Sequence, residues 1–396
     1  MSIEPEFSLL AATRSIGWGG VGKLGLILEK LPSAHVVLHG DEYTNALKKE
    51  FLGSHHKFEA RPPTRCDVAL VINDAAAANS IADLNVPVVY VDSLPYMRVT
   101  DDDIPEKVAF YCAQKYPIEL LPLTSPLLRK GHDISWIDPI VPTPQSRHGG
   151  RGIVINVGGL YTYGLAGLPS DLVNDAVDAY LNLVLFPLVD VLQGTGREIS
   201  AICGNINTDT CRRLRAIVPD SVTVSPQSPH AFERILADAD LLITSPGSTT
   251  ILQAISINLP TLLLPSQNRS QWFNAQIYSK PNAEIMQWPG SVLDVAELER
   301  KLSKGVVALN TYIYRSMIDA ATSQDLSDEV STTIRNALLN APDDGVLNPR
   351  LSALGDAGAD QVAQFVKQVA LRRQKDRQGQ PDLELSVETA PQDADR

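Results

Sequence analysis

The sequence contains little that would mark a metalloprotein or a disulfide-linked secreted protein. It has only four cysteines in 396 residues, Cys66, Cys112, Cys203 and Cys211, and no two of them form a C-x-x-C pair. Structural zinc sites and disulfide frameworks are usually recognised by closely and regularly spaced cysteines. Neither is therefore predicted, and the four side chains are expected to be buried free thiols.

Long apolar runs and an excess of basic residues are also missing. Hydrophobic residues make up 44% of the chain, yet no run approaches the length of about 20 residues that a membrane span needs. The N-terminus lacks the basic lead-in and cleavage site of a secretory signal. With 46 acidic against 34 basic residues the net charge is -12, which repels nucleic-acid phosphates. We expect a cytoplasmic monomer or homodimer that binds neither membrane nor nucleic acid.

The order of apolar segments indicates two α/β domains. In the first half, strand-like runs at 8–12, 36–39, 68–72 and 87–91 alternate with helical patterns at 24–31 and 75–81. The second half begins again with a strand at 153–157, the turn at Gly158 and Gly159, and a helix over 172–192 that Pro187 should kink. Strands at 199–203, 222–225, 241–244 and 261–264 follow, with helices at 231–237 and 249–257 between them. This pattern predicts two Rossmann-like domains, each with a parallel sheet, facing a cleft.

Composition sets the expected domain boundaries. A proline-rich stretch without periodicity runs from 136 to 150 and looks like a connection. We therefore expect an N-terminal domain over 1–140, a linker over 141–150 and a C-terminal domain with the final helices over 151–373. Residues 374–396 are polar, charged and poor in aromatics, which predicts a disordered tail.

The first glycine-rich loop fits two nucleotide-binding patterns. It consists of Gly17, Trp18, Gly19, Gly20, Val21, Gly22 and Lys23. As G-x-G-x-x-G, with Asp41 and Glu42 after the second strand, it is compatible with an NAD(P)-dependent oxidoreductase. As G-x-x-x-x-G-K it lacks the Ser or Thr of a P-loop, because Leu24 stands there. The alternative is that the glycines serve only a tight turn and close packing of helix on strand.

A second loop, over 240–255, is more specific. An apolar strand is followed by a Pro-Gly turn and a helix whose first turn is rich in hydroxyls. The free amides at such a helix start form an anion site, to which Ser248 and Thr249 next to Gly247 would add hydroxyl donors. Ser248 could instead be only an N-cap. However, four hydroxyl residues crowd around one glycine, which is more than a cap needs, so a diphosphate site is predicted.

An amide-rich loop comes directly afterwards. Gln267, Asn268, Gln271 and Asn274 carry side chains that both donate to and accept from sugar hydroxyls. The same side chains could cap a helix and line a wet turn. Both interpretations stay open from this stretch alone.

Taken together, residues 222–276 resemble the donor-binding half of the GT-B glycosyltransferases, especially the peptidoglycan N-acetylglucosaminyltransferase that forms lipid II. The resemblance implies a nucleobase loop at 225–229, a diphosphate turn at 247–249, and a ribose contact at Gln253, where that family usually has Glu. It also implies sugar contacts at Gln271 and Asn274, and it makes residues 17–22 an acceptor-side loop, with Lys23 where that family often has a His nearby. The donor-binding residues expected from this reading are Gly158, Gly159, Ser225, Gln227, Gly247, Ser248, Thr249, Gln253, Arg269, Gln271 and Asn274.

The resemblance predicts a metal-independent, inverting transferase that has no cofactor and uses a UDP-sugar as co-substrate. An acceptor proton must then be removed by a base. The candidates for this base are Asp92, Asp74 and His39, with Asp92 preferred because a carboxylate straight after a buried strand tends to point into the cleft; each could also simply cap a helix. Lys23 is the fourth residue expected to take part in catalysis. Asp101, Asp102 and Asp103 contain a D-x-D spacing, but they precede Ile104-Pro105 and are expected to form a charged turn. No metal site is predicted.

The acceptor is inferred from a further likeness. The segment 17–24, the chain length and the Pro-Gly-Ser-Thr-Thr loop look like the synthases that join cytosine or hydroxymethylcytosine to glucuronic acid from UDP-glucuronate in nucleoside antibiotic pathways. That likeness implies a small-molecule acceptor, an N-glycosidic bond, and a cation such as Arg269 or Lys23 for the glucuronate carboxylate. The alternatives are an NAD(P)-dependent oxidoreductase and a protein that senses a nucleotide sugar without catalysis.

Overall fold

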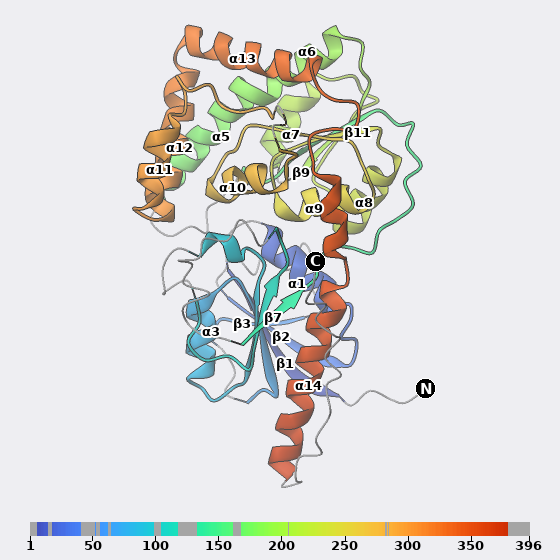
Figure 1. The fold of residues 1–396 in the computed structure, drawn as a ribbon, viewed down its shortest axis with the longest axis vertical. Coiled ribbons are helices and arrows are strands. Elements are labelled where there is room, and N and C mark those ends of the chain that lie inside the picture. Colours follow the sequence, from blue (N-terminus) through green and yellow to red (C-terminus); the bar gives the residue numbers. More distant parts are fainter. Residues whose placement is uncertain are drawn as a thin grey trace.

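The computed structural model of the chain describes residues 6–14, 18–40, 52, 56–61, 65–98, 104–117, 133–160, 168–204, 206–281, 283 and 285–378. It consists of two α/β domains, one above the other in Figure 1, each built around a parallel sheet. This confirms the predicted fold class, and the four cysteines are buried and free as expected.

The N-terminal sheet has seven parallel strands in the order β3-β2-β1-β4-β5-β6-β7. β4 and β5 are buried at every position, because helices cover both faces of such a sheet, and this is why their sequences are continuous apolar runs. The strands are β1 (Phe7–Thr13), β2 (Ala34–His39), β3 (Lys57–Glu59), β4 (Val68–Ile72), β5 (Val88–Asp92), β6 (Phe110–Gln114) and β7 (Ile134–Ile137), with α1 (Trp18–Leu28), α3 (Ala75–Ala82) and the 3-10 turn η1 (Pro95–Met97) between them.

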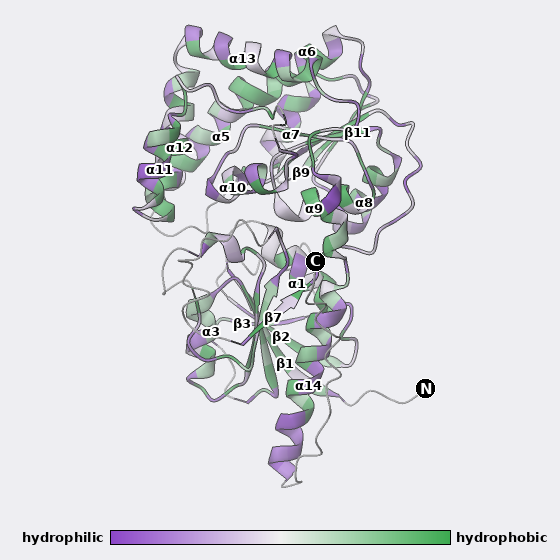
Figure 2. Cartoon of the chain, in the orientation of Figure 1, coloured by the Kyte–Doolittle hydropathy of each residue, from purple (hydrophilic) through white to green (hydrophobic). Residues whose placement is uncertain are grey.

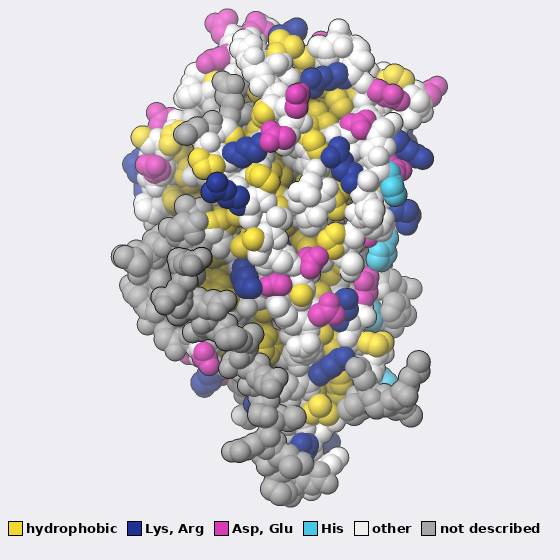
Figure 3. All heavy atoms as spheres, turned by 45° about the vertical axis from the view of Figure 1, so that its right-hand side comes forward, with side chains coloured by type: hydrophobic (Ala, Val, Ile, Leu, Met, Phe, Trp, Pro, Cys, Tyr) yellow, Lys and Arg dark blue, Asp and Glu magenta, His cyan; other side chains and the backbone are white. Residues whose placement is uncertain are grey.

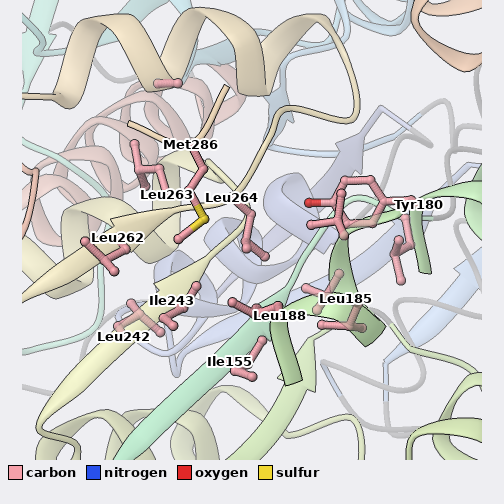
Figure 4. Packing of buried hydrophobic residues seen from close by; sticks show 14 of the residues in the cluster. Ile155, Tyr180, Leu185, Leu188, Leu242, Ile243, Leu262, Leu263, Leu264 and Met286 are labelled. Carbon is pink, nitrogen blue, oxygen red and sulfur yellow. The ribbon is translucent and has the colours of Figure 1, made fainter. Parts of the chain in front are cut away.

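The C-terminal sheet has five parallel strands in the order β10-β9-β8-β11-β12. Its strands are β8 (Ile153–Val157), β9 (Ile199–Gly204), β10 (Thr223–Val224), β11 (Leu241–Thr244) and β12 (Thr261–Leu263). Its helices are α5 (Ser170–Tyr180), α6 (Phe186–Gly194), α7 (Thr208–Arg215), α8 (Pro229–Asp238), α9 (Ser248–Ser256), α10 (Arg269–Tyr278), α11 (Val295–Leu302), α12 (Val306–Ala321) and α13 (Gln324–Leu339), followed by the 3-10 turn η5 (Pro349–Leu354). Figure 4 shows Ile155 of β8 beside Leu188 of α6 in the core of this domain, and Ile243 and Leu262 of the neighbouring strands belong to the same buried cluster.

The helical stretch Ser170–Gly194 passes the length and composition test for a membrane span, which corrects the expectation that no run would. It is interrupted by the π-helical turn η4 (Leu181–Leu185), directly before the expected kink site Pro187. The wider turn accommodates the missing N–H and the bulk of the proline ring. Of the apolar window, 61% is buried inside the protein, as is usual for a core helix.

The last helix, α14 (Gly358–Gln378), belongs with the N-terminal domain. Val362, Val366 and Ala370 share a buried cluster with Leu9 of β1 and Ile27 of α1, and Figure 1 shows α14 running down beside the N-terminal sheet. The assignment of all final helices to the C-terminal domain was therefore wrong for α14. Residues 374–378 are helical and are not part of a disordered tail. They belong to the hydrophilic end of α14 that is visible in Figure 2. Residues 379–396 lie outside the described part of the chain.

The strand order gives each sheet a switch point at the carboxyl ends of its strands. β1 lies between β2 and β4, and β8 lies between β9 and β11, so connections leave these strands toward opposite sides. Ligands of doubly wound sheets bind beyond the carboxyl ends of the strands at such a switch point. Residues that follow β1, β4, β8 and β11 are therefore where a binding site is expected.

Candidate functional site

A cavity of about 370 Å³ lies between the two domains and is lined by residues that follow those strands. The N-terminal wall contains Thr13 at the end of β1, Arg14 after it, one side of α1, and Asn73 and Ser93 after β4 and β5. The C-terminal wall includes Gly158 and Gly159, Gln227, Gln253, and the segments 247–250 and 268–271, together with Asn274. All expected donor-binding residues except Ser225 line the cavity, and Ser225 accepts a 2.7 Å hydrogen bond from the side chain of Gln227.

The start of α9 leaves its first amides open toward this cavity. Gly247 is the N-cap residue, and no side chain makes a capping hydrogen bond, so the interpretation of Ser248 as only an N-cap is wrong. Thr249 lines the cavity, and its Oγ1 is buried without a hydrogen-bond partner among the described residues. Open amides, the positive end of the helix dipole and a spare hydroxyl are the groups that bind a phosphate.

The amide-rich loop is tied into the protein by its own side chains. Asn268 caps α10 by accepting from the backbone N–H of Gln271. Gln271 donates to the carbonyl of Gly158 at 2.8 Å. Asn274 donates to the carbonyl of Pro246 at 2.7 Å. These amides therefore connect the turn after β8 with the turn after β11, and their contact with a sugar stays a prediction.

Gly159 is required by this arrangement. Its φ is +78°, and a Cβ at this position would lie 2.5 Å from Nε2 of Gln271. A side chain would both strain the backbone and displace the amide that holds the two turns together.

Of the four candidate catalytic residues, only Lys23 lines the cavity. It lies on the side of α1 that also presents Gly19, Gly22 and Leu26, yet its side chain is only 1% exposed. Its Nζ donates to Oε1 of Gln114 at 3.0 Å and to the carbonyl of Ile140 at 3.4 Å. Burial lowers the pKa of Lys23 to about 7, because the charged ammonium is disfavoured away from water. Near neutral pH a large fraction of Lys23 is thus uncharged.

The expectation that Asp92 points into the cleft is wrong. Its side chain is fully buried and accepts hydrogen bonds from Nε and Nη2 of Arg98 at 2.9 and 2.7 Å and from the Tyr111 hydroxyl at 2.7 Å. Burial by itself would lower the pKa of Arg98, but the Asp92 carboxylate outweighs it and raises that pKa well above its usual value. Asp92 therefore positions and neutralises Arg98, which does line the cavity.

Asp74 and His39 also lie away from the cavity lining. Asp74 is the N-cap of α3 and accepts from the backbone N–H of Ala77 at 3.0 Å, which is the capping role considered for it. His39, at the end of β2, has its Nδ1 3.1 Å from the carbonyl oxygen of Glu59 on β3. Neither position supports removal of a proton from a molecule bound in the cavity. Gly17, the side chain of Trp18, Asp41, Glu42 and the residues 101–103 lie outside what the structure describes.

The loop after β5 joins the two walls. The Tyr96 hydroxyl donates to Oδ1 of Asn274, and Nη2 of Arg269 donates to the carbonyl of Met97 at 2.9 Å. Tyr96 is packed in the core cluster of the C-terminal domain although it belongs to η1 of the N-terminal one. The relative placement of the two walls is therefore held by contacts beside the cavity.

The charges that line the cavity share one sign. Among the described lining residues the basic ones are Arg14, Lys23, Arg98 and Arg269, and none is acidic. Near neutral pH a large fraction of Lys23 is uncharged, and Arg98 is paired with Asp92. Arg14 and Arg269 therefore carry the net positive charge. This contrasts with the net charge of -12 for the chain, and with the face in Figure 3, where acidic and basic side chains are interspersed. A cation-lined cavity in an acidic protein favours anionic ligands. In the described part of the chain, no group of three or more His, Cys, Asp or Glu residues could hold a metal ion.

Comparison with known protein families identifies the family of this chain. A profile of the family described as CGA synthase-related protein matches residues 39–286. The chain belongs to this family. The matched segment contains the loop after β5 and the donor-side residues from Gly158 to Asn274, whereas α1 with Lys23 precedes it.

Similarities outside the family are more distant. A UDP-N-acetylglucosamine--N-acetylmuramyl-(pentapeptide) pyrophosphoryl-undecaprenol N-acetylglucosamine transferase of Caldanaerobacter subterraneus subsp. tengcongensis is 27% identical over 93 residues, which span 22% of this chain and 25% of that protein. The match thus spans about a quarter of the curated relative. Among solved structures, Acinetobacter baumannii MurG has 12% identity and a TM-score of 0.44, covering 92% of this chain and 100% of that chain. Arabidopsis thaliana UGT89C1 has 11% identity and a TM-score of 0.46, with the same coverage.

Several cavity residues escaped the sequence analysis. Thr13, Arg14, Asn73, Ser93 and Arg98 all line the N-terminal wall. Most of them could have been predicted from the rule that ligands bind beyond the carboxyl ends of parallel strands. The ends of β2, β4 and β5 gave candidates in this way, but the end of β1 was not considered. At β5 the residue that reaches the cavity is Ser93, one position after Asp92, because successive side chains point to opposite sides.

Proposed function

We propose that this protein is a metal-independent glycosyltransferase that moves a sugar from a UDP-sugar to a small acceptor bound in the same cavity. The observation that carries the proposal is the open N-terminus of α9, with the buried Thr249 hydroxyl, facing a cavity whose described charged residues are all cationic. Such a site stabilises the charge that develops on a departing diphosphate. The remote relative that matches part of the chain carries an N-acetylglucosamine transferase name, which agrees with this assignment.

The finer proposal is that the donor is UDP-glucuronate and the acceptor is cytosine or a related nucleobase. The family description refers to a CGA synthase, which agrees with the resemblance to cytosylglucuronate synthases. A uronate adds a carboxylate to the diphosphate, and a cation-lined cavity suits that additional negative charge. The uracil end of the donor is then expected near Gln227 and Phe232 on the C-terminal wall.

Lys23 is the base in this proposal. A neutral amine has two N–H groups and one lone pair, and both N–H groups have acceptors in Gln114 and Ile140. Because Lys23 lines the cavity, the proposal assigns its lone pair to the acceptor. The N–H proton of the acceptor passes to Nζ, and the freed electron pair on the ring nitrogen forms the bond to C1 of the sugar. The C1–O bond breaks, its electron pair leaves on UDP at the start of α9, and the ammonium of Lys23 later returns its proton to water.

Donor selectivity tests this function. The purified protein is titrated by calorimetry, in the presence of EDTA, with UDP, UDP-glucuronate, UDP-N-acetylglucosamine and NADH. We expect the uridine nucleotides to bind and Thr249→Val to weaken UDP binding about tenfold, as for the loss of one hydrogen bond to a charged group. Thr333→Val, which removes an exposed hydroxyl on α13, is the control. Binding of NADH alone would instead favour the oxidoreductase alternative.

A further inference from the structure

The N-terminal wall contains a buried hydroxyl that has no partner among the described residues. Thr13, the last residue of β1, is 3% exposed and lines the cavity, and its Oγ1 makes no hydrogen bond there. Buried hydroxyls normally have a partner, because losing water without replacement costs free energy. A donor of this kind at the edge of a cavity points to a ligand atom that accepts from it.

The first turn of α1 lies directly against this hydroxyl. A Cβ at Gly20 would be 2.3 Å from Oγ1 of Thr13, so only glycine lets the helix start approach so closely. At Gly19 and Gly22 an added Cβ would meet nothing within 4 Å, which leaves the backbone of α1 open on the cavity side. The helix has 11 residues, long enough for its positive end to attract an anion.

Arg14 follows Thr13 and is the lining cation best able to approach a ligand there. Its side chain is exposed and reaches the cavity at the switch point between β1 and β4. Arg98 is held by the Asp92 carboxylate, and the proposed function uses Lys23 as the base, which requires its uncharged amine.

Arg269, the other cation expected from the sequence to meet a glucuronate carboxylate, lies on the opposite wall. It is 5% exposed, donates to the carbonyl of Met97, and lies over the ring of Phe273 at 5.8 Å. Its position is therefore set by contacts within the protein. The wall that carries Thr13 and Arg14 lies across the same cavity from the diphosphate site on α9.

We propose that Thr13, Arg14 and the first amides of α1 form a carboxylate subsite, which binds the acid group of the sugar being transferred. This rests on the proposed function and extends it, because it makes the donor a UDP-uronate selected by residues of the N-terminal domain. The diphosphate and the carboxylate are then held by two helix starts, α9 and α1, on opposite walls. A carboxylate on the acceptor has the same chemistry and is the other source that the subsite would accept.

The test compares UDP, UDP-glucose and UDP-glucuronate by calorimetry on the wild type and on Arg14→Gln and Thr13→Val. We expect the wild type to bind UDP-glucuronate about tenfold or more tightly than UDP-glucose, as for one charge-assisted hydrogen bond. Both variants should lose that preference and bind UDP as the wild type does, which also shows that they are folded. Arg61→Gln, an exposed arginine of the same domain outside the cavity lining, should keep the preference.

A second arm identifies the source of the carboxylate. The UDP-loaded protein is titrated with orotate and with uracil, which differ by one carboxylate. A preference for orotate that Arg14→Gln removes, without a preference for UDP-glucuronate, would support the subsite and assign its carboxylate to the acceptor. If acid and neutral ligands bind equally in both arms while UDP still binds, the carboxylate subsite is refuted and the proposed function is not. A protein that does not bind UDP would overturn the proposed function together with it.

Discussion

Replacement of Lys23 by methionine should raise the stability of the protein near neutral pH and remove its activity. Methionine has similar length and no charge, so it fills the space under α1 without requiring a buried amine. The pKa of Lys23 falls from 10.5 in the unfolded chain to about 7 in the folded protein. Two hydrogen bonds are lost in the variant, but Oε1 of Gln114 still accepts from the backbone N–H of Ile140.

The size of the effect follows from that pKa change. Because the folded pKa is the lower one, the unfolded chain binds more protons between pH 7 and 10.5, and stability rises with pH in that window. Below pH 7 the buried charged lysine lowers the free energy of unfolding by its full amount, about 5 kcal/mol. Between pH 7 and pH 9 the free energy of unfolding of the wild type should rise by about 2 kcal/mol, whereas that of the variant lacks this increase.

Urea unfolding of both proteins from pH 6 to pH 9 measures this difference. We expect Lys23→Met to be more stable at pH 7 by about 3 kcal/mol, after about 1 kcal/mol for each lost hydrogen bond. That advantage should shrink by about 2 kcal/mol at pH 9. Lys107→Met, at an exposed position, is the control and should show no such trend. A difference between wild type and Lys23→Met that stays constant across this pH range would refute the neutral buried lysine.

The same variant separates binding from catalysis. It should bind UDP as the wild type does and lose at least about 100-fold in kcat, the usual contribution of a positioned base. The wild-type kcat/KM should rise with pH on its acid side with an apparent pKa of about 7. Retained turnover in Lys23→Met would remove Lys23 from the reaction.

Asp92→Asn should destabilise the protein by about 3 to 5 kcal/mol in urea unfolding, because it leaves a buried guanidinium without its carboxylate; a loss below about 1 kcal/mol would contradict the positioning role. Gly159→Ala should weaken UDP binding and lower Tm, since its Cβ would collide with the side-chain amide of Gln271, whereas Gly194→Ala, at an open position outside the cavity lining, should resemble the wild type. Val366→Ala on α14 should cost about 2 kcal/mol in urea unfolding, as for other core truncations, and the exposed Gln364→Ala should cost little; equal effects would argue against the docking of α14.

The elements that the sequence predicts well are those with continuous apolar runs. The strands at 68–72 and 241–244 have the bounds expected from their sequences. The short strands β3, β6 and β7 were not predicted, because their three to five residues lack a long apolar run; β3 and β7 lie at the two edges of the sheet. α1 starts at Trp18 and not at 24, since its glycines are weak helix formers that tertiary packing against Thr13 accommodates.

The two walls of the site differ in how far the sequence reveals them. The C-terminal wall is largely local: the turn at 247 and the loop at 268–274 are close together in the chain, so their residues could be found together. The N-terminal wall is assembled from Arg14, Asn73 and Arg98, which are far apart in the chain and meet only through strand order. The side-chain direction of Asp92 was missed because a strand-end position says where a residue lies but not toward which face it points.

The most direct test of the proposed transfer is to incubate the protein with UDP-glucuronate and cytosine in EDTA and to analyse the mixture by mass spectrometry. We expect UDP and a conjugate of cytosine with glucuronic acid to form in equal amounts, and neither to form with Lys23→Met. Intact UDP-glucuronate after prolonged incubation, with no UDP released from any UDP-sugar and acceptor pair offered, would contradict the assignment of this cavity to glycosyl transfer.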